Sequence, residues 1–323
     1  MPPIPALDPE ALPVLVEIVR SGFVEGVHRG RLVLLDADGS VSLEVGDARA
    51  TVLPRSSNKL MQATGMLEAG LDLEGELLAV AAGSHSAQEF HIEAVRKILA
   101  GAGLSEDALQ TPSAAPSDEQ ALAAFHRAGE HPAPVYFNCS GKHAAMLATS
   151  VRNGWPIETY LDPEHPVQLA ARAAIERLTG ESVQAEAVDG CGAPLLGFSL
   201  LGLARAFRAA VLAEPGTAER RVADAMRAHP RYVSGDAGLD TIAMSTVTGL
   251  LAKIGAEAVY AAALPDGRAL AFKIDDGAKR AVPVVLAEAL RRLDVAAAEV
   301  APFGTVPLYG GGRPVGELRP AFG

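Results

Sequence analysis

The sequence predicts an α/β fold in which an antiparallel sheet is flanked by helices and carries a helical lobe. Residues 14–46 and 256–275 are rich in strand-forming side chains, and each stretch contains a tight-turn pair, Asp38-Gly39 and Asp266-Gly267. Between them, from about 56 to 250, apolar residues recur with the helical period, and Gly or Pro stands at the breaks. Antiparallel hairpins near the two ends can pair into one sheet, so we expect the middle of the chain to lie beside it.

The helical period is clearest in residues 89–103, 166–180 and 199–213, and a further helix is expected in 277–294, before a Gly/Pro-rich tail. Prolines and serines in residues 109–120 predict a loop. We expect one catalytic unit over 1–323, in which 1–55 and 250–323 form the sheet and 56–249 form the mainly helical lobe. A cleft between sheet and lobe is the natural place for a site.

Composition and charge restrict the class of protein. The 323 residues carry a net charge of −11 and a pI near 5.2, whereas nucleic acid or an anionic membrane surface requires a basic partner. The N-terminal stretch contains acids and prolines in place of the basic start of a secretory signal, and no apolar run is long enough to span a membrane. Two cysteines make no disulfide framework. We therefore expect a soluble cytoplasmic protein.

The stretch PRSSNK, residues 54–59, places Ser56 three residues before Lys59. On a helix these two side chains share a face, and a helix N-terminus favours an oxyanion while it disfavours a protonated amine. Lys59 could then take the proton of Ser56 and activate it as a nucleophile. An N-capping serine followed by an exposed lysine is the ordinary alternative. Only six lysines accompany 22 arginines, which favours functional lysines because a guanidinium cannot lose its proton.

Two later motifs favour the catalytic interpretation. Residues 83–91, GSHSAQEFH, offer Ser84, His85 and Ser86 in a turn before a helix, and Lys253 stands at the start of a strand, two residues before Gly255. This order of Ser-x-x-Lys, Ser-x-Ser and Lys-x-Gly resembles that of the penicillin-recognising serine hydrolases, whose three corresponding motifs line one cleft.

Both cysteines lie in turns of small residues, within NCSGKHAAML (138–147) and DGCGAP (189–194). The segments Cys139-x-x-Lys142-His143 and Asp189-Gly190-Cys191 could converge on a zinc ion, because two thiolates, a nitrogen donor and water form an open site that suits zinc. The alternative is that both cysteines are buried as small hydrophobic side chains.

Taken together, PRSSNK, SHS, NCSGKHAAML, DGCGAP, AKIGAEAVYAAALP and KIDDGAKRA resemble, in order, the blocks of the L-asparaginase II family, the rhizobial inducible type. The resemblance covers roughly residues 10–320. It implies a serine β-lactamase/glutaminase-like fold, hydrolysis of L-asparagine to L-aspartate and ammonia, and a homodimer.

The resemblance also implies roles for individual residues. Ser56 and Lys59 match the family's nucleophile and base, and a second Ser-Lys pair falls on Ser86 and Lys253, with Lys273 as the alternative lysine. The family's zinc ligands match Cys139, Lys142 and Cys191. We expect Arg55, Asp189 and His85 to contact the substrate.

Two other enzymes remain open from the sequence. One is a zinc-dependent amidohydrolase in which the metal generates the nucleophile. The other is a β-lactamase or peptidase-like serine hydrolase, whose substrates lie outside the cytoplasm.

Overall fold

A computed structural model describes residues 12–322. Residues 1–11, which include much of the N-terminal stretch on which the absence of a secretory signal is predicted, lie outside the described part. The main element is an eight-stranded sheet in the order β10-β11-β1-β2-β9-β8-β7, with β3 also paired to β2. Its strands are β1 (Val14–Arg20), β2 (Phe23–Leu35), β3 (Val41–Val45), β7 (Leu251–Gly255), β8 (Val259–Ala263), β9 (Ala269–Ile274), β10 (Pro307–Gly310) and β11 (Arg313–Pro320).

Every strand pair in this sheet is antiparallel. The long strand β2 connects the N-terminal and C-terminal strands in one sheet. Its second half pairs with β9, from Gly30 opposite Ile274 to Leu35 opposite Ala269. The two turns predicted from Asp-Gly pairs are confirmed. Gly39 and Gly267 adopt φ values of +88° and +94°, a region that glycine enters without steric cost.

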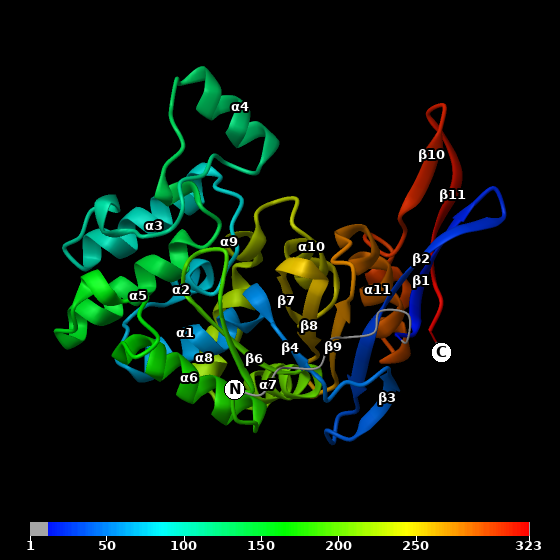
Figure 1. Ribbon diagram of the computed structural model, residues 1–323, viewed down its shortest axis with the longest axis horizontal. Coiled ribbons are helices and arrows are strands. Elements are labelled where there is room, and N and C mark those ends of the chain that lie inside the picture. Colours follow the sequence, from blue (N-terminus) through cyan, green and yellow to red (C-terminus); the bar gives the residue numbers. More distant parts are fainter. Residues whose placement is uncertain (1–11, 323) are drawn as a thin grey trace.

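The C-terminal segment differs from its prediction as a Gly/Pro-rich tail. Strands β10 and β11 form a hairpin that pairs with β1 and extends the sheet (Figure 1). Gly311 and Gly312, both with positive φ, make the turn. The strands were missed because Pro and Gly interrupt both of them, and because most of their side chains are not buried, so the alternation of apolar residues is weak.

Most helices form a lobe at one end of the sheet, and the predicted fold of an antiparallel sheet flanked by helices is confirmed (Figure 1). The helices are α1 (Lys59–Glu68), α2 (Gly75–Ala81), α3 (Glu89–Gly101), α4 (Glu119–Arg127), α5 (Ser140–Asn153), α6 (Pro166–Thr179), α7 (Leu200–Leu212), α8 (Ala218–Ala228), α9 (Pro230–Ser234), α10 (Leu239–Thr246), α11 (Val282–Arg292) and α12 (Ala297–Val300). A small antiparallel sheet of β4 (Thr51–Val52), β6 (Pro194–Ser199) and β5 (Ala185–Val188) lies among them.

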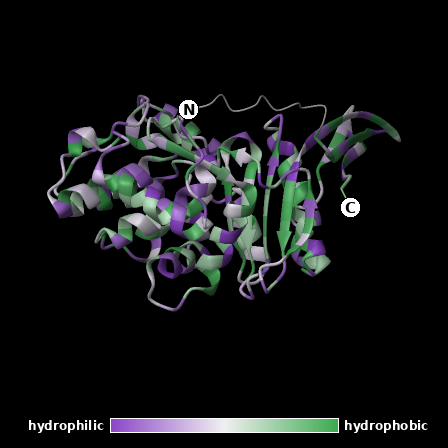
Figure 2. Cartoon of the chain, turned by 60° about the horizontal axis from the view of Figure 1, so that its bottom comes forward, coloured by the Kyte–Doolittle hydropathy of each residue, from purple (hydrophilic) through white to green (hydrophobic). Residues whose placement is uncertain are grey.

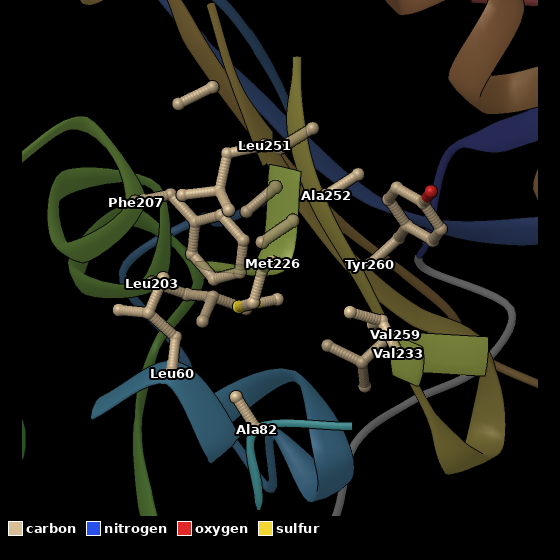
Figure 3. Packing of buried hydrophobic residues seen from close by; sticks show 14 of the residues in the cluster. Leu60, Ala82, Leu203, Phe207, Met226, Val233, Leu251, Ala252, Val259 and Tyr260 are labelled. Carbon is tan, nitrogen blue, oxygen red and sulfur yellow. The ribbon is translucent and has the colours of Figure 1, made fainter. Parts of the chain in front are cut away.

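A continuous apolar core joins the lobe to the sheet. Helix α7 packs on β2, β8 and β9, while α11 packs on β1 and β11, and the strands of the main sheet show long hydrophobic runs (Figure 2). In Figure 3, Leu203 and Phe207 of α7 lie with Met226 of α8 and Leu60 of α1 near Leu251 of β7. All five are buried, and full burial of such a side chain contributes about 1.5–3 kcal/mol. The core therefore anchors the start of α1 beside the edge strand β7.

Within residues 12–322, no helix combines the length and the apolar character that crossing a membrane requires.

His91, in the first turn of α3, is buried with both ring nitrogens engaged. Its Nδ1 accepts from the backbone N–H of Gln88 at 3.2 Å, and its Nε2 donates to the carbonyl of Arg231 at 2.9 Å. Only a neutral imidazole can make both bonds. Burial lowers the pKa of His91 from 6.5 to about 4, against a smaller opposing effect of the Arg231 carbonyl.

Between about pH 6.5 and pH 4, His91 is therefore protonated in the unfolded chain but neutral in the folded protein. We expect this residue to remove about 2–3 kcal/mol of unfolding free energy as the pH falls from 7.5 to 4.5, at about 1.4 kcal/mol per pKa unit. Urea unfolding of the wild type and of His91→Gln at both pH values measures the difference. Equal losses in the two proteins would contradict this account.

Candidate active site

Lys59 is the centre of the candidate site. It begins α1 directly after the short 3-10 helix Arg55–Asn58, and only 1% of the residue is exposed. Its Nζ donates to the carbonyl of Gly83 and, at 3.0 Å, to the hydroxyl of Ser84. Among residues 12–322 no carboxylate forms an ion pair with it. A buried ammonium without an acid is costly, so this environment favours the neutral amine.

Burial and two neighbouring lysines together lower the pKa of Lys59, against the effect of one neighbouring sulfur. Burial lowers its pKa below that of an ordinary lysine. The thiol of Cys139 opposes this effect, whereas the positive charges of Lys142 and Lys253 lower the pKa further. The four side chains come from α1, α5, β7 and the turn before α5, so the fold assembles the group from distant parts of the chain.

Ser56 lies one turn before Lys59, and its carbonyl accepts the backbone N–H of Lys59. Its side chain is partly exposed, and no hydrogen bond engages its hydroxyl within the described residues. The direct Ser56–Lys59 side-chain bond that the spacing predicts is not formed, because the Lys59 side chain extends to Gly83 and Ser84. The neighbouring Ser57 is buried, and its hydroxyl donates to the carbonyl of Pro54 at 2.6 Å.

The backbone beside Ser56 is held in a strained conformation. Arg55 has a φ of +52°, which costs a non-glycine residue of order 1–3 kcal/mol and occurs most often at functional sites. Strand β7 presses on this turn at Gly255, where a Cβ atom would lie 2.4 Å from the carbonyl oxygen of Pro54. Only glycine allows that approach, so Gly255 fixes the turn against the sheet.

Arg55 and Asp189 are brought together, with Nε 2.7 Å from Oδ1. Burial alone would raise the pKa of Asp189, but the hydrogen bond from Arg55 and the charge of Lys142 hold it below its usual range. The carboxylate is therefore ionised and is shared between Arg55 and the cysteine-containing loop.

The structure places Ser84, and not the predicted Ser86, beside Lys59. The hydroxyl of Ser86 contacts Gln88 Oε1 at 3.3 Å instead and faces a separate open cavity that Asp118 and Asp236 also line. In a regular strand residues two apart would face the same side, so this loop departs from strand geometry, as the φ of +60° at Ala87 also shows. Both serines belong to the same short motif, so the sequence located the loop without distinguishing between them.

His85 lies between these two serines and is 1% exposed. Its Nδ1 accepts from the backbone of Ala87 at 3.2 Å, and its Nε2 contacts the hydroxyl of Ser140 at 2.8 Å. Its ring also stacks on that of His91. Both nitrogens are thus occupied inside the protein, and this placement indicates that His85 shapes the loop rather than contacting a substrate.

Lys253 reaches the site from β7. It is fully buried, and its Nζ lies 3.2 Å from Oδ2 of Asp240 and donates to the carbonyl of Ile254 at 2.8 Å. Asp240, at the start of α10, also accepts the backbone N–H of Ile254. No motif indicated Asp240, because a single acid in a helix has no distinctive spacing. The alternative lysine, Lys273, lies in a different groove with Arg31.

The three predicted zinc ligands converge. Cys139 precedes α5, Lys142 lies in its first turn, and Cys191 lies in the loop between β5 and β6. Lys142 Nζ is 3.3 Å from Cys191 Sγ, and Cys191 packs in one cluster with Cys139. Both cysteines are free thiols.

The two cysteines fit a zinc site chemically, whereas the two sulfurs and Asp189 raise the pKa of Lys142 against the effect of burial, so Lys142 must lose a proton to bind a metal. The pKa of Cys139 is lowered by a hydrogen bond from Cys191 and by the charges of Lys59 and Lys142, so a thiolate, which is the metal-binding form, is favoured there. No group of three His, Cys, Asp or Glu side chains in residues 12–322 is arranged to hold a metal ion. A metal in this place therefore requires Lys142 as a neutral amine ligand.

Comparison with solved structures finds distant similarities in fold. A protein named Mglu in its native form matches with a TM-score of 0.45 and 14% identity, over 82% of this chain and 64% of that one. The hydrolase EstCE1 matches with a TM-score of 0.44 and 10% identity, over 81% and 93% of the two chains. A β-lactamase from Mycobacterium bovis gives 0.38 and 14%, over 80% and 94%. The chain spans 60–64% of the length of the first two Mglu structures.

No curated protein gives a significant match. The family described as L-asparaginase II, however, matches residues 16–320. This range contains the turn at Ser56, the loop at Ser84, both cysteine motifs and the strand that carries Lys253. The chain belongs to the L-asparaginase II family.

Proposed function

We propose that this protein hydrolyses the side-chain amide of L-asparagine to L-aspartate and ammonia. Family membership supports an amidohydrolase. The observation that carries the mechanism is the burial of Lys59 without an acid partner in the described residues, next to two other lysines. A lysine kept neutral in this way can act as a general base at physiological pH.

The bonds of Lys59 leave its basic electron pair available. A neutral amine has two N–H groups and one lone pair. Gly83 and Ser84 provide acceptors for two N–H groups, which leaves the third tetrahedral position of the nitrogen to the lone pair, with Cys139 also close by. Ser56, whose hydroxyl is partly exposed and unengaged in the described residues, is the serine one turn away that can supply a proton.

In this mechanism Ser56 Oγ attacks the amide carbon while its proton passes to Lys59. The resulting oxyanion lies near the N-terminal end of α1, where backbone N–H groups and the helix dipole favour negative charge. Lys59 then gives this proton to the amide nitrogen, the C–N bond breaks and ammonia leaves. Water attacks the aspartyl ester while Lys59 takes its proton, the bond between the acyl carbon and Ser56 Oγ breaks, and Lys59 returns the proton to Ser56.

Ser84 and Lys253 take supporting roles in the proposal. Ser84 replaces Ser86 as the second serine, because its hydroxyl bonds to Lys59. Lys253 is held by Asp240 in a full ion pair, and its positive charge keeps the pKa of Lys59 low, after the larger effect of burial.

A zinc ion would be held by Cys139, Lys142 and Cys191. When bound, it supplies a Lewis acid that can anchor the amino or carboxylate group of the substrate. Asp189, 3.9 Å from Cys191 Sγ and paired with Arg55, connects this site to the turn that carries Ser56. We also propose that the chain forms a homodimer, as the family resemblance implies.

Replacing Ser56 by Ala should lower kcat for ammonia release from L-asparagine by at least about 10³-fold, since the nucleophile is lost. Ser86→Ala is the matched control and should stay within about twofold of the wild type. Steady-state ammonia assays, with circular dichroism to confirm folding, measure both. Retained activity in Ser56→Ala would exclude Ser56, and loss of activity in Ser86→Ala would return the second role to Ser86.

Removal of metal distinguishes the serine route from a zinc-dependent amidohydrolase. We expect purified protein to carry about one zinc per chain, and Cys191→Ser to lose it, as measured by elemental analysis. After exhaustive chelation, KM for asparagine should rise at least about tenfold while kcat falls only a few-fold. Complete loss of kcat that zinc alone restores would instead assign the nucleophile to the metal.

A further inference from the structure

A groove of about 470 Å³ lies between the main sheet and the small sheet, apart from the catalytic group. The wall formed by β4, the residue after it and β5 carries four apolar side chains: Val52, Leu53, Ala185 and Ala187. The opposite wall is formed by β2 and β9 and carries two cationic side chains, Arg31 and Lys273.

These two cations face each other directly. Arg31 and Lys273 are opposite partners in the β2–β9 register, so their side chains leave the same face of the sheet. Like charges in such a pair destabilise a sheet. An arrangement of this kind is expected to persist where a third group supplies negative charge.

Within the described residues no carboxylate forms an ion pair with either cation, although three acids are close enough to raise the pKa of Lys273. Arg31 is 3% exposed, yet its Nη1 is buried without a hydrogen-bond partner in residues 12–322. Lys273 donates to the backbone carbonyls of Ile274 and Asp275, not to a carboxylate. Burial, opposed by nearby acids and assisted by Arg31, lowers the pKa of Lys273.

Three carboxylates also line the groove, and none of them forms an ion pair with Arg31 or Lys273 among the described residues. Glu186 pairs with Arg172, and Glu257 is 4.0 Å from Arg55 with 65% of its side chain exposed. Asp275 forms no ion pair with either cation among the described residues. Among residues 12–322, therefore, a buried guanidinium with no partner for its Nη1 lines a cavity that has room for a ligand.

We propose that this groove binds a small organic anion, with a carboxylate or phosphate group against Arg31 and Lys273 and an apolar body against the small sheet. A guanidinium presents paired N–H donors that match the oxygens of either group, and buried charge-assisted bonds of this kind are strong. The four apolar side chains opposite suit a hydrocarbon or aromatic body.

The groove is a second site, distinct from the proposed reaction centre. Ser56, Lys59 and Ser84 do not line it in the described structure, but Arg55 does. Since Arg55 also holds Asp189, a bound anion would lie next to the strained turn before Ser56. The inference itself does not depend on the proposed reaction.

Titration calorimetry on the intact protein tests the site with three probes of similar shape: benzoate, phenyl phosphate and benzyl alcohol. We expect at least one of the two anions to bind with a Kd below about 1 mM, and the neutral alcohol to bind at least tenfold more weakly. The tighter anion identifies the preferred head group. Equal binding of all three, or no binding, would overturn the proposal.

Variants locate the binding. Arg31→Met should weaken anion binding at least tenfold, and Lys273→Met should weaken it less, because Lys273 also bonds to backbone. The control Arg313→Met removes an exposed arginine of β11 and should leave Kd unchanged. Arg31→Met removes a like-charge contact, so its thermal midpoint should not fall. Unchanged affinity in Arg31→Met, or competitive displacement of the anion by L-aspartate, would contradict a separate site at Arg31.

Discussion

The candidate site depends on one electrostatic constraint: three buried lysines share a small volume and cannot all carry a charge without partners. Lys253 has Asp240, with which it forms a buried ion pair. Lys142 has Cys191 at 3.3 Å, and the two sulfurs and Asp189 outweigh the effect of burial, so the pKa of Lys142 is raised. Lys59 donates to a carbonyl and a hydroxyl and has no carboxylate partner among residues 12–322. Burial and the charges of Lys142 and Lys253 lower its pKa although Cys139 opposes them, and a lowered pKa is the direction that a general base needs.

The fold maintains this constraint through packing. Leu60 follows Lys59 into the core that joins α1, α7, α8 and β7 (Figure 3). Gly255 allows β7 to lie against the turn that carries Ser56. The loop of Ser84 is fixed by the stacked, neutral rings of His85 and His91. The reactive group is therefore supported on rigid elements from four separate parts of the sequence, and the buried lysines are kept from water.

Local patterns allowed much of this to be predicted. The Asp-Gly turns located two hairpins, and the short blocks around Ser56, Cys139 and Cys191 indicated the residues that converge. The sequence could not show which way a side chain points or which residue it contacts. Ser84 and Ser86 differ only in which side of a loop they face, and Asp240 has no motif. Arg31 looks like an ordinary strand residue until the β2–β9 register places it opposite Lys273. The β10–β11 hairpin escaped prediction because its stability comes from pairing with β1, not from its own composition.

The protonation state of Lys59 is the most direct test of the account. Nitrogen-15 NMR of lysine-labelled, metal-loaded protein at about pH 8 reports whether each Nζ is an amine or an ammonium, and Lys59→Met assigns the signal. The signals of exposed lysines such as Lys97 serve as internal references. The expected result is a neutral-amine signal that disappears in Lys59→Met. An ammonium signal for Lys59 at this pH would contradict the central claim.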